Sequence, residues 1–280
     1  MNKTLAIFEL MRLDKPIGIY LLLWPALLAL VISSNGNFEY VDLIIVIIGS
    51  ILVRSAGCVI NDIWDKDLDG GVERTKTRPI PSKKLSISES WVVFAVLGIL
   101  SLMLLSLTNV NTILISICFG LMIVVYPLTK RFFLGPQIFL GLTFNPTIIV
   151  YAMTNELNNP TMIFLYLAIA AKTIAFDSFY GLCDMEDDKK LGINSTPLWW
   201  GSKTLLIIAI LQFTVISFLL IVGLKAELSS AWCIGIILLS GFYFYQHQLA
   251  SQKNFLLAFK NNHWASLYLL TLSVFCFLII

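Results

Sequence analysis

An acidic stretch between residues 61 and 69 carries the side chains that hard metal ions prefer. Asn61, Asp62, Asp65 and Asp69 follow one another at spacings of i, i+1, i+4 and i+8. If this stretch is helical, an amide and three carboxylates line one side of about two turns, where their like charges repel. A cation is therefore expected among them. Ligands that offer only oxygen favour an ion such as Mg²⁺, which also bridges to substrate phosphates.

A second acidic cluster lies much later in the chain. Asp177, Asp184 and Asp188 are spaced i, i+7 and i+11, which again places them on one helix face. Between the clusters, Arg74 and Arg78 offer guanidinium groups suited to phosphate or carboxylate. Two acidic faces that converge could hold metal ions against a diphosphate from two sides. The alternative is a pair of solvated loops, but each cluster adjoins a long apolar segment, where desolvated charge tends to be functional.

The composition indicates an all-α, polytopic membrane protein. The 280 residues are 58% hydrophobic and 13% charged, with a mean hydropathy of +0.85. Soluble domains are typically about 45–50% apolar and about 25% charged. The net charge of +2 is too small to indicate nucleic acid as a partner. From the apolar composition, we expect membrane lipid to surround the protein.

Apolar segments of membrane-spanning length divide the chain, which we interpret as one domain over residues 1–280. Residues 1–16 are amphipathic and are expected to lie on the membrane surface. Nine spans are predicted, forming a helical bundle: 17–34, 41–59, 88–107, 110–127, 136–153, 161–182, 204–223, 230–246 and 263–280.

Basic residues are distributed unevenly between the two sets of alternate loops. Those on one side, with the N-terminus, carry nearly all the Lys and Arg, whereas the other set holds only Lys225. The positive-inside rule therefore predicts a cytoplasmic N-terminus and an external C-terminus. Both acidic clusters then lie at the cytoplasmic face.

Four motifs in order resemble one known family. The stretch from Asn61 reads NDxxDxxxD and is followed from Arg74 by RTxxRP. This pattern resembles the UbiA superfamily of intramembrane aromatic prenyltransferases, in particular its branch that prenylates 4-hydroxybenzoate. Three further segments are similar: RLDKPIG at 12–18, YPLTKRF at 126–132, and DSFYGLCDMEDD at 177–188 with GINST at 192–196. The chain departs from the family pattern at Lys172, at Asn145-Pro146 and at Ala265.

The resemblance implies a reaction, a cofactor and a set of residues. The reaction is transfer of a polyprenyl group from polyprenyl diphosphate to the ring carbon ortho to the hydroxyl of 4-hydroxybenzoate, in ubiquinone synthesis. It would take place in a cytoplasm-facing cavity in the bacterial inner membrane. The implied Mg²⁺ ligands are Asn61, Asp65, Asp69, Asp184 and Asp188, with Asp62 as a further candidate. The implied diphosphate contacts are Arg74, Arg78 and Lys130, with Tyr126 beside Lys130 as a further catalytic candidate.

The carboxylate of the aromatic acceptor also needs a partner. Arg12, Arg54, Arg78 and Lys15 remain open as candidates, and an arginine gives the better bidentate fit. Asp177 could orient the acceptor or pair with Lys172, whose mid-span position fits either a functional role or a snorkelling side chain.

Two other functions stay open at this point. A related prenyltransferase would use another acceptor, for instance a naphthoate, a haem or a polar lipid. A cation-coupled transporter would bind ions at carboxylates near the membrane midplane. Against the transporter, the acidic residues gather at one face together with cations suited to diphosphate.

Overall fold

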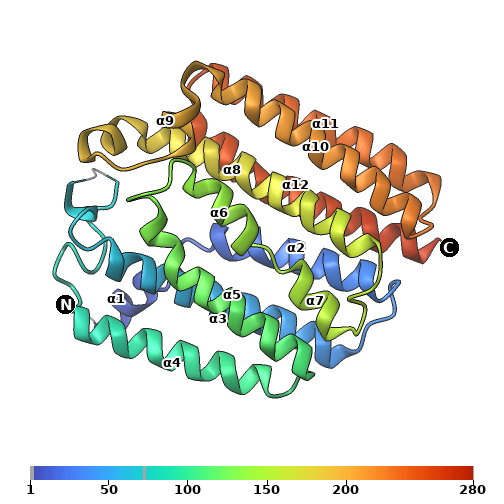
Figure 1. Cartoon of the computed structure of the whole chain (residues 1–280), viewed down its shortest axis with the longest axis horizontal. Coiled ribbons are helices and arrows are strands. Elements are labelled where there is room, and N and C mark those ends of the chain that lie inside the picture. The colour runs from blue at the N-terminus through green and yellow to red at the C-terminus, as the bar shows by residue number, and fades with distance from the viewer. Residues whose placement is uncertain (1–2, 72–73, 280) are drawn as a thin grey trace.

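A computed structural model describes residues 3–71 and 74–279, and these residues form helices and loops with no strand. The predicted all-α class is therefore confirmed (Figure 1). The helices are α1 (Lys3–Leu10), α2 (Ile17–Ser33), α3 (Tyr40–Trp64), η1 (Asp69–Gly71), α4 (Ile87–Leu105), α5 (Val110–Thr129), α6 (Pro136–Thr143), α7 (Thr147–Met153), α8 (Thr161–Leu191), α9 (Thr196–Trp200), η2 (Gly201–Lys203), α10 (Thr204–Lys225), α11 (Ser230–Ser251) and α12 (Phe255–Leu278).

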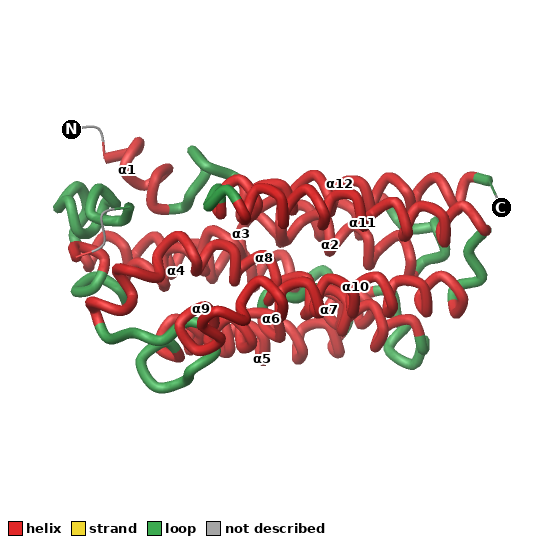
Figure 2. Tube along the Cα trace, turned by 90° about the horizontal axis from the view of Figure 1, so that it is seen from above, coloured by secondary structure: helices red, strands yellow, loops and turns green. Residues whose placement is uncertain are grey.

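The long helices run along the long axis of the molecule and pack side by side. Helix α8 contacts α6, α10 and α12, and α2 contacts α3 and α12. Seen from above, α2, α11 and α12 lie on one side, with α5, α6, α7 and α10 on the other (Figure 2). Helix α1, α9 and the segment between α3 and α4 gather at one end, and the end of α12 lies at the opposite end (Figure 1).

Several helices are long and apolar enough to cross a bilayer, so the chain is a membrane protein. Among the described residues, five helical segments meet criteria of length and hydropathy, namely α3, α4, α5, α8 and the segment from Thr196 to Lys225. Helix α2 is apolar but has only 17 residues. Helices α4 and α5 expose Ile99, Met103 and Leu114, which do not line the cavity, as expected of surfaces that face lipid. The count of nine spans is not established, although a long helix covers most of eight of the predicted spans.

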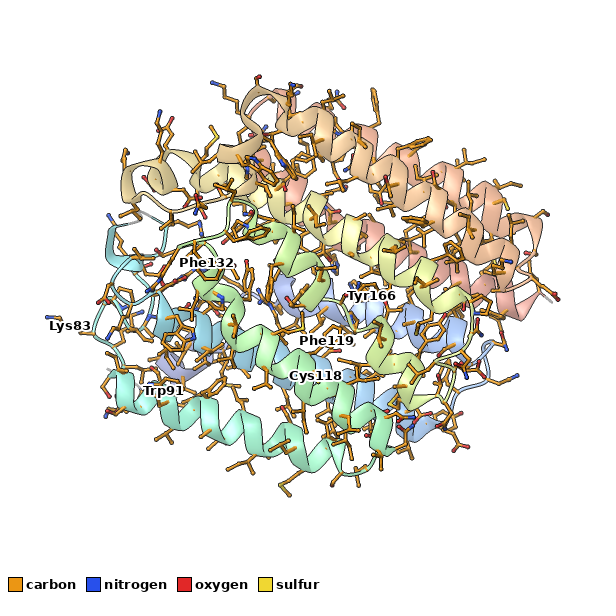
Figure 3. All side chains as sticks on the ribbon, viewed as in Figure 1. Lys83, Trp91, Cys118, Phe119, Phe132 and Tyr166 are labelled. Atoms are coloured by element: carbon orange, nitrogen blue, oxygen red, sulfur yellow. The ribbon has the colours of Figure 1, made fainter. Side chains whose placement is uncertain are left out.

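The predicted span at 136–153 is wrong as a single helix, because the chain breaks between α6 and α7. A residue before proline avoids the helical region, which ends α6 before Asn145-Pro146. The Asn145 side-chain amide donates to the Tyr166 carbonyl (2.8 Å), and the Tyr166 hydroxyl donates to the Leu142 carbonyl (2.9 Å). Figure 3 labels Tyr166 on α8. Helix α8 thus satisfies backbone and side-chain groups that a helix break leaves open inside a membrane.

Other boundaries also differ from the predicted ones. Helix α3 continues to Trp64 and α8 to Leu191, so both reach beyond the predicted spans and carry acidic residues with them. Helix α1 packs against the bundle, since Ala6 and Leu10 are buried in a cluster with Val59 of α3, and its location on the membrane surface stays a prediction. Residues 1 and 2 of the predicted lead-in and residue 280 of the last span lie outside the described residues.

Candidate active site

A cavity of about 1400 Å³ opens between the helices and reaches the end of the molecule where α1, α9 and the segment after α3 gather. Every predicted site residue lines this cavity. They are Arg12, Arg54, Asn61, Asp62, Asp65, Asp69, Arg74, Arg78, Tyr126, Lys130, Asp177, Asp184 and Asp188. The fold therefore brings together segments that are far apart in the sequence.

The first acidic motif is not one continuous helix, so that part of the prediction is wrong. Helix α3 ends at Trp64, Asp65 caps it, and Asp69 begins the short helix η1. The backbone amide of Asp69 donates to the Asp65 carbonyl (2.8 Å), so the turn still returns Asp69 to the cavity.

Two hydrogen bonds fix the end of α3 against α5. The Trp64 indole donates to the Val124 carbonyl (3.1 Å), and the Arg131 guanidinium donates to the Trp64 carbonyl (2.6 Å). The ammonium of the neighbouring Lys130 lies within ion-pair distance of Asp65 Oδ2. The Asn61 amide donates to the same oxygen (3.2 Å). Asp65 Oδ1 is buried without a hydrogen-bond partner in the described residues.

Asp62 lies between two arginines and is only 1% exposed. Arg12 donates to both of its carboxylate oxygens (2.8 and 2.7 Å), and Arg78 donates to Oδ1 (3.0 Å). Arg78 also donates to Asp69 Oδ2 (2.8 Å). Asp62 thus anchors the cations at this wall of the cavity. Its predicted role as a metal ligand stays a prediction.

The second acidic motif lies on the last turns of α8. The helix is continuous through Leu191, so Asp177, Asp184 and Asp188 are on one helix as the spacing predicted. Arg74 donates to both oxygens of Asp184 (3.0 and 2.5 Å), and its guanidinium covers the Tyr180 ring at 4.6 Å. Sequence reasoning left Tyr180 out of the site. Its position three residues after Asp177 and four before Asp184 could have revealed it.

Each acidic wall is therefore joined to a cation from another segment, Arg74 with Asp184 and Lys130 with Asp65. Burial raises the pKa of Asp65, and Lys130 only partly opposes this. Burial likewise raises the pKa of Asp69 against the effect of Arg78. Burial alone would lower the pKa of Arg74, but the hydrogen bonds with Asp184 and neighbouring negative charges raise it above its usual value. A further positive charge beside Asp65 and Asp69 would oppose this effect of burial and favour their ionised forms.

The donor set fits Mg²⁺ as an ion shared with a phosphate. No three Asp, Glu, His or Cys side chains in the described part of the chain come close enough to form a complete metal centre. Magnesium commonly uses one or two carboxylates, with waters and substrate phosphates completing its shell. Carboxylates on two walls, with Asp65 Oδ1 free of a hydrogen bond, match that requirement.

The GINST segment positions Lys130 and the end of α8. The backbone amide of Asn194 donates to the Lys130 carbonyl (2.8 Å), which ties this segment to the end of α5. The backbone amide of Thr196 donates to Gln137 Oε1 (2.8 Å), and the hydroxyl groups of Thr196 and Ser178 form a hydrogen bond with each other (2.8 Å). Asn194 and Gln137 also line the cavity, although neither was predicted as a site residue.

Arg54 differs from the other predicted cations. Arg12, Arg74, Arg78 and Lys130 each pair with a carboxylate, whereas Arg54 makes no ion pair with any residue that the structure describes. Its Nε atom is buried without a hydrogen-bond partner there.

Lys172 lies outside the cavity and does not pair with Asp177. Its ammonium donates to the Ser266 hydroxyl and to the Asn262 carbonyl (3.5 Å), and both acceptors belong to α12. Lys172 is 3% exposed, so it links two helices within the bundle.

Comparison with known proteins gives one family. The pattern of the UbiA prenyltransferase family matches residues 22–278. A Pseudomonas aeruginosa protein named 4-hydroxybenzoate octaprenyltransferase is 40% identical over 265 residues, which cover 92% of this chain and 89% of that protein. A Vibrio campbellii protein of the same name is 39% identical over 272 residues, which cover 95% of each chain.

Solved structures share the fold. The apo structure of a UbiA homologue from Aeropyrum pernix superposes with a TM-score of 0.78 at 20% identity, covering 90% of this chain and 94% of that one. A UbiA homologue from Archaeoglobus fulgidus bound to GPP and Mg²⁺ superposes with a TM-score of 0.70 at 15% identity, covering 95% and 99%. The chain therefore belongs to the UbiA prenyltransferase family.

Proposed function

We propose that this protein is a Mg²⁺-dependent enzyme that transfers a polyprenyl group from polyprenyl diphosphate to 4-hydroxybenzoate. The new bond forms at the ring carbon ortho to the hydroxyl, as a step of ubiquinone synthesis. The observation that carries the proposal is the meeting of two acidic motifs and their cations in one cavity, in a chain about 40% identical to proteins named 4-hydroxybenzoate octaprenyltransferase.

The diphosphate is assigned to the space between the two acidic walls. Arg74 and Lys130 each hold a carboxylate of one wall in the absence of substrate. They are free to exchange these partners for phosphate oxygens, which leaves Asp184 and Asp65 to bind metal. Arg78 keeps its ion pairs with Asp62 and Asp69 and adds positive charge to the wall that carries these two carboxylates. Guanidinium and ammonium groups are the usual protein partners of phosphate.

Magnesium is assigned to Asn61, Asp65 and Asp69 on one wall and to Asp184 and Asp188 on the other. When bound, the ion supplies positive charge that stabilises the leaving diphosphate. A UbiA homologue from Archaeoglobus fulgidus is bound to GPP and Mg²⁺, which supports Mg²⁺ as the ion. We place Asp62 behind these ligands, because two arginines already occupy its oxygens.

The acceptor carboxylate is assigned to Arg54. Among the predicted candidates, Arg12 and Arg78 are occupied by Asp62, whereas Arg54 has no carboxylate partner in the described chain. Asp177 lines the same cavity and makes no ion pair with any described residue. We assign it the hydroxyl of the acceptor, since accepting that hydrogen bond makes the ortho carbon more nucleophilic.

The prenyl chain is assigned to the apolar part of the cavity between α3, α4 and α5. That part is lined by side chains such as Val53, Phe94, Leu102 and Ile117, and by Phe119, which lies on α5 (Figure 3). An apolar wall beside lipid-facing helices suits a long hydrocarbon tail.

In the reaction, the chain's own residues act by position and charge. Arg74 and Lys130 interact more strongly with the diphosphate as its negative charge grows on cleavage of the carbon–oxygen bond. Tyr126 and Tyr180 line the cavity and present aromatic rings that stabilise the allylic cation. Arg54 and Asp177 hold the acceptor ring so that its ortho carbon attacks, and the ring then loses a proton.

The location and orientation in the membrane are proposed from the distribution of basic residues. We propose that residues 1–280 form one domain in the bacterial inner membrane, with the N-terminus and cavity mouth cytoplasmic and the C-terminus outside. The excess of Lys and Arg in the loops at the cavity end supports this orientation.

An acceptor panel tests the proposal. Purified protein in lipid would receive octaprenyl diphosphate and Mg²⁺ with 4-hydroxybenzoate, a hydroxynaphthoate or no acceptor, and the products would be identified by mass spectrometry. We expect a prenylated 4-hydroxybenzoate that disappears with EDTA. Product with the naphthoate alone would keep the reaction class and overturn the substrate. Ion flux in vesicles without any covalent product would instead indicate a transporter.

A further inference from the structure

The Arg54 guanidinium lies directly against the backbone of α2 at Gly18. A Cβ atom on residue 18 would be 2.5 Å from Arg54 Nε, 2.8 Å from Nη2 and 3.0 Å from Cζ. Cβ atoms do not approach other groups so closely, so only glycine leaves room for the guanidinium here. Because Nε and Nη2 face Gly18, the third nitrogen, Nη1, points away from α2.

The ring of Phe144 covers the same guanidinium from another helix. Arg54 Cζ lies 5.2 Å from the ring centroid, within the range of a cation–π contact. Phe144 is the C-cap of α6, at the break before α7. The hydrogen bond from the Asn145 side chain to the Tyr166 carbonyl holds the residue next to Phe144 against α8.

Arg54 is thus immobilised without being neutralised. Its Nε atom is buried and has no hydrogen-bond partner in the part of the chain that the structure describes, and no described carboxylate lies within ion-pair distance. Because Nε faces Gly18, a ligand cannot reach it; the terminal nitrogens make no hydrogen bond with any described residue and are not buried, so they are the donors left for a ligand. Gly18, Arg54 and Phe144 all line the cavity.

We propose that Gly18 and Phe144 are positioning residues that clamp Arg54 and thereby select an acceptor with a planar aryl carboxylate. Gly18 bounds one edge of the guanidinium and Phe144 one face, so Nη1 keeps a single direction into the cavity. A carboxylate that arrives on a flat ring meets a donor already held in place, which lowers the entropy cost of binding. This inference rests on the proposed function and on the assignment of the acceptor carboxylate to Arg54.

Two substitutions test the clamp, with one matched control. In Gly18→Ala the new methyl group displaces the guanidinium, and in Phe144→Leu the ring is lost while an apolar side chain remains. Gly241→Ala is the control. Gly241 lies on α11 outside the cavity, with nothing within 4 Å of an added Cβ. Turnover would be measured over a range of concentrations of each substrate.

We expect Gly18→Ala and Phe144→Leu to raise the KM for 4-hydroxybenzoate about tenfold, the size of one lost charge-assisted hydrogen bond. The KM for polyprenyl diphosphate should stay within about twofold. The preference for 4-hydroxybenzoate over phenol, which lacks the carboxylate, should fall by the same factor as the KM rises. Gly241→Ala should behave as wild type.

A double-mutant cycle separates the clamp from simple packing. In an Arg54→Lys background, the flexible amine has no guanidinium for Gly18 to position, so Gly18→Ala should cause little further change in acceptor KM. If the two effects multiply instead, Gly18 acts only through packing and the clamp is overturned. If Gly18→Ala does not insert, Phe144→Leu in the same background gives the same test.

Different results would overturn the proposed function and the clamp formed by Gly18 and Phe144. Wild-type protein that makes no product with 4-hydroxybenzoate would overturn the proposed function and the clamp with it. An active wild type whose acceptor KM and phenol discrimination are unchanged in both variants would overturn the clamp alone.

Discussion

Asp62 and Asp65 belong to one motif, yet their surroundings predict opposite effects when each is changed to asparagine. Asp62 is 1% exposed and accepts three hydrogen bonds from two arginines. Asp65 is also buried, but one of its oxygens has no partner among the described residues. We therefore expect Asp62→Asn to impair stability and Asp65→Asn to impair binding of metal and diphosphate.

The expected size of the stability effect follows from these contacts. Removing one partner of a buried ion pair costs about 3–5 kcal/mol. The introduced asparagine keeps one acceptor oxygen, and the side chains of Arg12 and Arg78 are 22% and 17% exposed, so about 2–3 kcal/mol is expected. At about 2.1 cal/mol/K of unfolding entropy per residue, 280 residues give about 0.6 kcal/mol/K. Asp62→Asn should then lower the Tm by about 3–5 °C.

Asp65→Asn should change the Tm by less than about 2 °C, because burial already disfavours the charged carboxylate. The partly exposed ammonium of Lys130 can turn toward the cavity when its partner becomes neutral. Turnover should nonetheless fall by at least about 100-fold, as for other groups that stabilise developing charge.

Thermal unfolding in lipid or detergent gives both readouts. The Tm would be measured first with EDTA and then with Mg²⁺ and inorganic diphosphate, since ligands that bind only the folded state raise the Tm. The ligand-dependent rise should persist in Asp62→Asn and vanish in Asp65→Asn. The exposed Asp67, which does not line the cavity, supplies the control Asp67→Asn, and it should change neither value. An Asp62→Asn protein with normal Tm and no ligand-dependent rise would show that Asp62 binds the metal and does not anchor the two arginines.

Three further outcomes are expected. Arg54→Ala should raise the KM for 4-hydroxybenzoate by about 10-fold to 100-fold while the KM for polyprenyl diphosphate stays nearly constant. Equal losses in both would show that Arg54 binds phosphate. Lys172→Leu should keep turnover within about threefold in the product assay, because Lys172 lies outside the cavity and an apolar side chain of similar volume replaces it at little cost. Complete inactivation with normal membrane insertion would contradict this. Arg131→Ala removes the hydrogen bond to the Trp64 carbonyl and should raise the Mg²⁺ concentration for half-maximal turnover by about tenfold, as for other supporting contacts of metal ligands. An unchanged Mg²⁺ dependence would show that the end of α3 is held without it.

Much of the helical fold could be predicted from the sequence because apolar runs of spanning length have few alternative structures in a membrane. Helix α8 illustrates this, since its continuous helix was enough to align Asp177, Asp184 and Asp188. The break between α6 and α7 was missed. Residues 136–153 are apolar throughout, and the partners that make a break tolerable come from Tyr166 on another helix.

The residues that line the site could be predicted from the sequence more readily than the ion pairs that they form. Residue types and spacing placed Asp65 and Asp69 in the cavity even though the expected helix ends before them. Which cation meets which carboxylate depends on tertiary packing. No spacing rule joins Arg74 to Asp184 or Lys130 to Asp65. Tyr180 could have been predicted from its helical spacing to Asp177 and Asp184. It was missed because an aromatic residue in an apolar helix is usually a packing residue.

The most direct test of the two-walled diphosphate site is an experimental structure with Mg²⁺ and a non-reactive prenyl thiodiphosphate. We expect the diphosphate to lie between the wall of Asp65 and Asp69 and the wall of Asp184 and Asp188. Arg74 and Lys130 should have moved from their carboxylates to phosphate oxygens, and Arg54 should touch no phosphate. A diphosphate bound at Arg54, or one that leaves the pairs Arg74–Asp184 and Lys130–Asp65 intact, would contradict this expectation.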